Sequence, residues 1–147
     1  MTNSIPRDVA LLIARVVVGV VFIAHGWQKF NEWGLVGTGA SFDQMGVPLP
    51  TVSAWFAAIV ELAGGIALVA GVAVPLVSLL LFVNMLGAFL IVHATNGVFV
   101  GDGGFELVAT LGAAALLFAA LGAGRYSVDR FLAPRLPAQL TRQTVNA

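Results

Sequence analysis

The sequence predicts an all-α membrane protein, a bundle of four transmembrane helices with both termini in the cytoplasm. The first reason is composition: of the 147 residues, 59% are hydrophobic and only 10% are charged, whereas a soluble domain carries about 25% charged residues. The second reason is that the hydrophobic residues form four long runs. The third is the position of the basic residues, which follows the pattern of cytoplasmic ends.

The four hydrophobic runs cover residues 9–27, 52–74, 76–93 and 105–121. A helix needs roughly 17–25 residues to cross a hydrocarbon core about 30 Å thick, and the runs are of this length. A basic residue, Arg7, precedes the first run, as in a signal peptide. The run is longer than a usual signal core and has no small-x-small cleavage site, so we expect a retained helix. The second and third runs meet at residues 71–75, where Gly71 and Pro75 favour a tight hairpin.

Basic residues flank the bundle on one side. Arg7 precedes the first run, and four arginines follow the last one: Arg125, Arg130, Arg135 and Arg142. The positive-inside rule therefore puts both termini in the cytoplasm. We expect a transmembrane domain over residues 1–131 and a polar cytoplasmic tail over residues 132–147.

The longest connection, residues 31–51, is rich in glycine and proline. It predicts a lid or a short re-entrant segment on the outer face, with a flexible loop as the alternative. In the second run, Ala63, Ala67 and Gly71 recur at four-residue spacing, which lets helices approach closely in lipid. We expect this face to pack inside the bundle, with a homo-oligomer contact as the alternative.

Several classes of function are excluded by composition. The chain has no cysteine, which rules out thiol–disulfide exchange, thiolate zinc sites and iron–sulfur ligation. A net charge of zero gives no basic surface for nucleic acid. The sequence has no flavin or nicotinamide motif, so a redox role would take its electrons from a partner or a small donor.

Three charged residues fall inside the hydrophobic runs: Arg15, Glu61 and Glu106. A charge at the centre of a spanning helix costs about 2.5–3.5 kcal/mol on insertion scales, so such residues usually find a partner inside the bundle. Arg15, about 10 Å into its run, is within reach of Glu61 or of lipid headgroups, and is a candidate ligand for a quinone or a headgroup. Glu61 is predicted either to exchange protons with a bound ligand or to fix helix register as a neutral or paired carboxyl. Asn84 in the third run is predicted to bridge helices.

A second group of polar residues is expected near the outer mouth of the bundle. His25 and Lys29 are one helical turn apart on one face, and His93, Asp102 and Glu106 return to a similar depth at the third connection. These residues are predicted to surround one pocket, in which the histidines and lysine bind a quinone carbonyl or an anionic headgroup. A divalent metal is a weaker alternative because neither helix carries two ligands at metal spacing, and no tightly bound metal or flavin is predicted. The plainest alternative is that each histidine bonds a loop carbonyl.

Short motifs recur along most of the chain in a characteristic order. They are Arg15 with Gly19, FIAHGWQK at 22–29, GVP at 46–48, ELAGG at 61–65 with Leu68 and Gly71, His93, GFE at 104–106 and GAGRYSVD at 122–129. In these motifs the chain resembles the DoxX family of four-helix membrane proteins over residues 9–131. Ala123 is a minor departure, since proline is common there in the family.

The resemblance implies a bacterial inner-membrane protein. Related DoxD-type proteins are subunits of a quinone-reducing thiosulfate oxidoreductase, and other relatives are linked to oxidative-stress complexes. Relatives that act through cysteine pairs are no guide to this chain, which has none.

Three functions therefore remain open. The first is a quinone-linked subunit acting with a partner redox protein: His25 and Lys29 would bind a menaquinone or ubiquinone carbonyl, and Glu61 or Glu106 would relay protons. The second is an assembly or scaffold subunit of a larger membrane complex. The third is a transporter of a small solute or protons, for which four spans per chain would require dimerisation.

Overall fold

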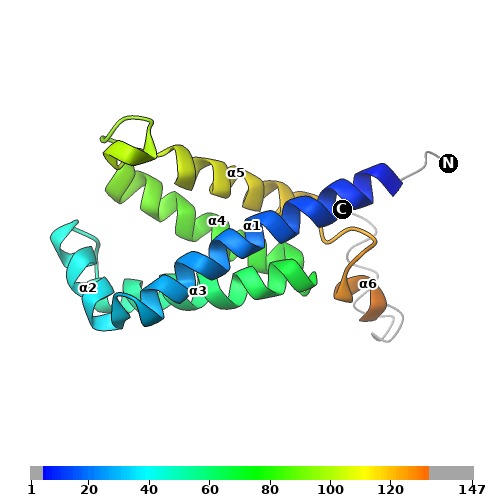
Figure 1. Ribbon diagram of the computed structural model, residues 1–147, viewed down its shortest axis with the longest axis horizontal. Helices are drawn as coiled ribbons and strands as arrows, with labels where there is room; N and C mark the ends of the chain where they lie inside the picture. The colour runs from blue at the N-terminus through cyan, green and yellow to red at the C-terminus, as the bar shows by residue number, and fades with distance from the viewer. Residues whose placement is uncertain (1–4, 133–147) are drawn as a thin grey trace.

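The computed structural model describes residues 5–132, and within them every regular element is helical (Figure 1). The elements are α1 (Ile5–Asn31), α2 (Gly34–Gln44), α3 (Pro50–Ala70), α4 (Val74–Ala88), the π-helix η1 (Phe89–His93), the 3₁₀ turn η2 (Val100–Asp102), α5 (Glu106–Leu121) and α6 (Val128–Leu132). The predicted all-α class is confirmed. Of the tail predicted at residues 132–147, all but the first residue lies outside the described residues.

Three of the four predicted spans have the length and hydropathy of a membrane-crossing helix. They are Ile5–Asn31, Pro50–Ala70 and Val74–His93, the last of which joins α4 to η1. The fourth, α5, is apolar but has only 16 residues. At 1.5 Å per residue it is about 24 Å long, which is shorter than a typical hydrocarbon core. Among residues 5–132 the structure thus contains three helices of spanning length and a shorter apolar helix beside them.

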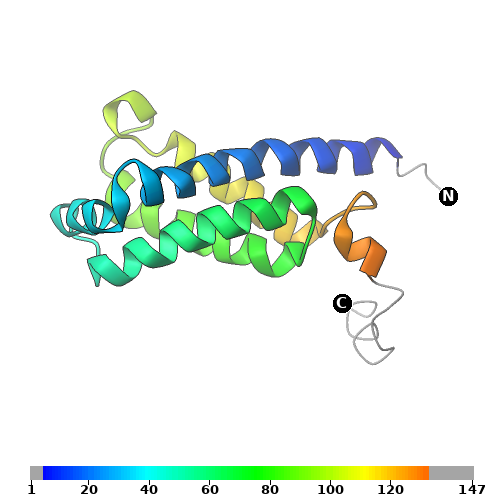
Figure 2. The same ribbon diagram turned by 60° about the horizontal axis from the view of Figure 1, so that its bottom comes forward.

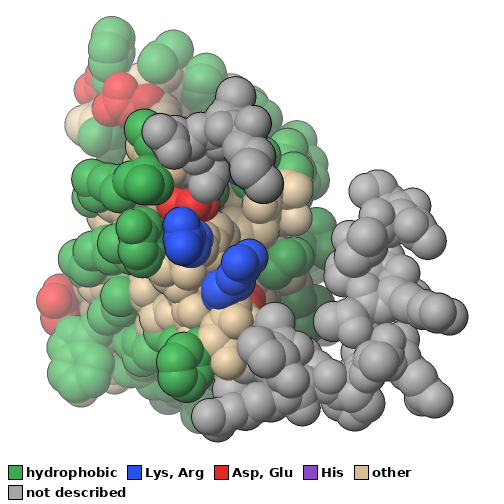
Figure 3. All heavy atoms as spheres, turned by 90° about the vertical axis from the view of Figure 1, so that its right-hand side faces the viewer, with side chains coloured by type: hydrophobic (Ala, Val, Ile, Leu, Met, Phe, Trp, Pro, Cys, Tyr) green, Lys and Arg blue, Asp and Glu red, His purple; other side chains and the backbone are tan. Residues whose placement is uncertain are grey.

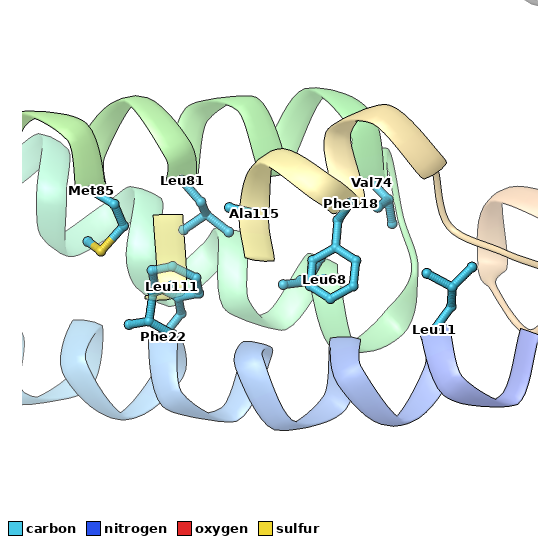
Figure 4. Close-up of a cluster of buried hydrophobic side chains, with 9 residues drawn as sticks. All are labelled: Leu11, Phe22, Leu68, Val74, Leu81, Met85, Leu111, Ala115 and Phe118. Atoms are coloured by element: carbon cyan, nitrogen blue, oxygen red, sulfur yellow. The ribbon is translucent and has the colours of Figure 1, made fainter. Parts of the chain in front are cut away.

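The four long helices pack into one bundle. α1 packs on α3, α3 on α4 and α4 on α5, while α5 also touches α1 (Figure 2). Their inner faces meet in a continuous apolar core, which Figure 4 shows in close-up: Leu11, Phe22, Leu68, Val74, Leu81, Met85, Leu111, Ala115 and Phe118. The outer faces are also apolar, and side chains such as Ile13, Val17 and Leu117 are more than half exposed. Such a surface suits a lipid environment and not water.

Glycine allows α1 and α3 to approach closely. A Cβ atom at Gly26 would overlap the main-chain nitrogen of Leu62 and lie 2.8 Å from its Cα. One at Gly65 would lie 2.7 Å from the carbonyl oxygen of Gly19. Of the face predicted to pack inside the bundle, Gly71 is buried and Ala67 is half-buried, but Ala63 is exposed. Small residues occur all around α3, so a four-residue spacing alone does not identify the packed face.

The long connection between α1 and α3 is folded, not a flexible loop. It contains α2, whose Thr38 is fully buried. The Thr38 hydroxyl lies 2.9 Å from the carbonyl oxygen of Gly34 and 3.4 Å from that of Lys29. α2 packs on α3 and covers the end of the bundle at which α1 ends (Figure 1), as expected for a lid.

The hairpin predicted between the second and third runs is confirmed, and it is closed by a residue from far along the chain. Gly71 ends α3 with a φ of 75°, and the main-chain nitrogens of Ala73 and Val74 donate to the carboxylate of Asp129 over 2.7 and 3.1 Å. The main-chain nitrogen of Asp129 in turn donates to the carbonyl oxygen of Gly71 over 3.0 Å. Asp129 therefore caps the start of α4 and fastens α6 to the hairpin.

Replacing Asp129 with alanine should lower the free energy of unfolding by about 0.5–2 kcal/mol, since two amide donors at the start of α4 lose their acceptor. Thermal unfolding of the purified protein in mild detergent measures this. Asp43→Ala is the matched control, because Asp43 is exposed and far from the hairpin. An equal loss in both variants would contradict the capping role.

The start of α1 and α6 lie at the same end of the bundle (Figures 1 and 2). The opposite end holds α2 and the connection between η1 and α5. The two ends of the described chain therefore lie at the same end of the bundle.

Candidate functional site

Glu61 lies at the centre of a buried polar cluster between three helices. The residue is 3% exposed and stands near the middle of α3. Its Oε2 is 2.5 Å from Nζ of Lys29 on α1, and its Oε1 accepts a 2.9 Å hydrogen bond from the Asn84 amide on α4. Each carboxylate oxygen thus has its own donor, which a buried charge requires.

Lys29 reaches Glu61 from the last turns of α1. The residue is 8% exposed, and its Nζ also lies 3.4 Å from the carbonyl oxygen of His25, one turn earlier. α2 covers this turn, since Thr38 contacts the Lys29 carbonyl oxygen. Within residues 5–132, Lys29–Glu61 is the one ion pair between side chains.

Asn84 performs the bridging role predicted from the sequence. Its amide joins α4 to α3 through the Glu61 carboxylate. The sequence identified it as a lone polar residue in an apolar helix but gave no means to find its partner.

His25 lies beside the cluster with one ring nitrogen occupied. Its Nδ1 is 2.9 Å from the carbonyl oxygen of Val21. Because a carbonyl only accepts, Nδ1 is inferred to carry the hydrogen, which leaves Nε2 of the neutral ring as an acceptor. The side chain is half-buried, and within residues 5–132 its one side-chain hydrogen bond is the contact of Nδ1 with Val21.

An apolar groove opens next to this turn. It has a volume of about 200 Å³ and lies between α2 and α3. Trp55 of its wall packs edge-on against Phe30, the neighbour of Lys29, with ring centroids 6.3 Å apart. The lining is otherwise small or apolar: Leu35, Val36, Gly39, Ala40 and Thr51.

The structure groups the other predicted residues separately. Nδ1 of His93 is 2.7 Å from the carbonyl oxygen of Gly103, and Oε1 of Glu106 accepts a 2.9 Å hydrogen bond from the main-chain nitrogen of Val100. Both side chains therefore fasten the η1–α5 connection, as in the plainest alternative for His93. Asp102 is exposed on this connection. Among residues 5–132, no group of three or more His, Asp or Glu side chains could hold a metal ion.

Arg15 has different partners from the two that the sequence suggested. It is fully buried, and its Nη1 and Nη2 donate to the carbonyl oxygens of Ala123 and Tyr126 over 2.6 and 2.7 Å. It thus reaches neither Glu61 nor a headgroup, and instead anchors the segment after α5. The buried guanidinium thereby supplies donors to two main-chain carbonyls of the irregular segment that follows α5.

Sequence reasoning missed Asp8 and Asp129 as structural residues. Asp8 is 8% exposed, and its Oδ1 lies 3.3 Å from the main-chain nitrogen of Arg125. Asp8, like Arg15, contacts the segment 122–129. Asp129 belongs to that segment and contacts the hairpin between α3 and α4. In the sequence, only the motif GAGRYSVD at residues 122–129 indicated that this segment is important.

Comparison with known proteins places these residues in a family. A sequence model of the DoxX family matches residues 10–94, which include the whole Lys29–Glu61–Asn84 cluster. The chain belongs to the DoxX family. No solved structure matches the chain.

The DoxX relatives include proteins of several bacteria. The chain is 34% identical over 130 residues to the inner membrane protein YqjF of Escherichia coli, covering 86% of this chain and 94% of that protein. It is 32% identical over 104 residues to "Putative oxidoreductase CatD" of Bacillus subtilis, covering 71% and 74%. It is 30% identical over 141 residues to the uncharacterized membrane protein Rv3486 of Mycobacterium tuberculosis, covering 88% and 85%. The chain is therefore a DoxX-family membrane protein.

Proposed function

We propose that this protein is a membrane subunit of a quinone-linked redox system, in which the Lys29–Glu61–Asn84 cluster handles protons. The observation that carries the proposal is the Glu61 carboxylate, buried at mid-helix and held by one ammonium and one amide. A buried carboxylate with a cationic partner can take up or release a proton when a nearby ligand changes charge. The oxidoreductase name of the relative CatD supports the same class of chemistry.

The residues around the cluster suit a quinone and its quinol. Reduction of a quinone takes up electrons and an equal number of protons, and oxidation of the quinol releases them. Nε2 of neutral His25 would accept a hydrogen bond from a quinol hydroxyl, which is the reverse of the donor role expected from the sequence. Lys29 would supply a donor to a quinone carbonyl, and the apolar groove beside Trp55 would take the ring or the tail. Menaquinone and ubiquinone both have these groups.

The electrons would come from or go to a partner redox protein. We place the chain in a bacterial inner membrane, with the end that carries the start of α1 and α6 in the cytoplasm, because the basic residues gather there. The names of the Escherichia coli relatives YqjF and YphA, both inner membrane proteins, support this location. The histidine and the groove would then face the outer leaflet.

Binding of a short-tailed quinone to the purified protein tests the proposal. We expect saturable quenching of tryptophan fluorescence, because Trp55 lines the groove. The quinol form is titrated separately. Glu61→Gln removes the carboxylate that holds Lys29 and should weaken binding of the quinone, whereas His25→Ala should weaken binding of the quinol by about tenfold, the usual effect of losing one hydrogen bond.

Glu32→Gln is the matched control, since Glu32 is exposed at the end of α1. Its affinity should equal that of the unaltered protein. If all variants that keep the fold bind the quinone and the quinol equally well, the proposed site is wrong and the cluster has a purely structural role, as a scaffold subunit would have.

A further inference from the structure

A basic pocket lies at the end of the bundle opposite α2. It has a volume of about 530 Å³ and is lined by residues of two parts of the chain that are far apart in the sequence, the start of α1 and the segment 124–130: Arg7, Asp8, Gly124, Arg125 and Arg130. Figure 3 views this end, and Lys or Arg side chains gather near its centre. The pocket is separate from the Glu61 cluster, because Glu61 lies about half-way along the bundle.

The three arginines of this pocket carry more positive charge than their surroundings neutralise. Arg7, Arg125 and Arg130 are exposed, and within residues 5–132 none of them forms an ion pair. Residues 1–4 and 133–147 contain no Asp or Glu. An acidic side chain of this chain could therefore come only from the described part.

The two carboxylates at this end are already committed to the backbone. Asp8 in the wall is 8% exposed, and its Oδ1 faces the main-chain nitrogen of Arg125. Asp129 caps the start of α4 through both of its oxygens. Within residues 5–132, the three guanidinium groups of the pocket thus outnumber the carboxylates beside them.

The fold holds the arginine-bearing segment in place. Gly124 has a φ of 73°, a conformation that favours glycine. Arg15 fixes the carbonyl groups on either side of it, at Ala123 and Tyr126. The main chain at Arg125 is thereby fastened to α1, so the guanidinium groups converge on a preformed wall and not on a free tail.

We propose that this pocket binds a phosphate group, either that of an anionic phospholipid or free inorganic phosphate. Guanidinium forks match the geometry of phosphate oxygens and bind them bidentately. Apolar side chains on the neighbouring surface, including Ile5, Val128 and Phe131, are exposed and would suit acyl chains. Basic pockets between helices at one membrane face are a known form of headgroup site.

Native mass spectrometry in non-ionic detergent tests the pocket without a charged bilayer surface. The probes are phosphatidylglycerol, phosphatidylcholine as the zwitterionic comparison, and inorganic phosphate measured separately by calorimetry. We expect one phosphatidylglycerol to be retained per chain in preference to phosphatidylcholine. Binding of inorganic phosphate as well would identify free phosphate as a ligand, and its failure to bind would identify the lipid headgroup as the source.

Variants that change affinity in opposite directions separate binding from damage to the fold. Arg125→Gln with Arg130→Gln should weaken binding by about tenfold or more, since each lost arginine removes a charge-assisted hydrogen bond. Asp8→Asn should strengthen it, because the amide oxygen still faces the Arg125 nitrogen while the negative charge is gone. Asp43→Asn, which removes one exposed charge on α2 at the opposite end of the bundle, should change affinity by less than about twofold.

The proposal is overturned if phosphatidylglycerol and phosphatidylcholine bind equally and phosphate does not bind. It is also overturned if the double arginine variant, with its thermal unfolding unchanged, binds the anion as well as the unaltered protein does. Neither result depends on whether the chain binds a quinone.

Discussion

Replacing Lys29 with methionine should lower the free energy of unfolding by about 3–5 kcal/mol, the range measured when one partner of a buried ion pair is removed. The variant leaves the Glu61 carboxylate between three helices with only the Asn84 amide as a donor. Methionine is unbranched and only one atom shorter than lysine, so most of the loss reports on charge and not on a cavity. Thermal or detergent unfolding of the purified protein measures the change.

The double variant Lys29→Met with Glu61→Met is the control that separates pairing from packing. With both charges gone, no carboxylate is left unpaired, and replacement of a whole buried ion pair by apolar residues is often neutral. We therefore expect the double variant to be more stable than Lys29→Met alone. If the two losses are the same, the ion pair does not hold the helices together as inferred.

Replacing Gly26 with alanine should cost about 1–3 kcal/mol, the usual effect of forcing a methyl group into a packed interface. The added Cβ would overlap the main chain of Leu62, and a backbone cannot move aside as a flexible side chain can. α1 and α3 would separate, and the Lys29–Glu61 pair that spans them would be strained with them.

Gly87→Ala is the matched control for this substitution. Gly87 also lies inside a long apolar helix, but a Cβ there has open space within 4 Å. Alanine should be neutral or stabilise α4 by about 0.5–1 kcal/mol, since glycine weakens helix interiors. Equal unfolding temperatures for the two variants would contradict the close contact at Gly26.

The partner of Glu61 could not be found from the sequence, and helix register explains why. If the end of the first predicted run, residue 27, is set beside the start of the second, residue 52, Arg15 lies opposite residue 64, within one helical turn of Glu61. In the structure α1 continues to Asn31, and Gly26 lies against Leu62. Arg15 then lies opposite the α3–α4 hairpin, about 18 Å from the level of Glu61. Lys29 takes its place.

The polar residues near the η1–α5 connection illustrate the same limit. His25 and His93 were assigned to one pocket because both stand at the outer ends of their runs. Each histidine instead has a main-chain carbonyl as its neighbour, Val21 for one and Gly103 for the other. The sequence shows how far along a helix a residue lies. It does not show which way the side chain points around the helix axis when every face of the helix is apolar.

The sequence by itself determined that this is a membrane protein, that it is helical, and that a hairpin lies at residues 71–75. It also showed that Glu61, a carboxylate in the middle of a helix, needs a partner. These follow from the amount and order of apolar residues, from glycine and proline, and from the cost of a charge in lipid. Only the tertiary structure decided that Lys29 and Asn84 are those partners, and that Arg7, Arg125 and Arg130 converge on one pocket. The physical reason is that register and helix rotation are set by close contacts between surfaces, here at Gly26 and Gly65, and a shift of one turn moves every polar group to a new neighbour.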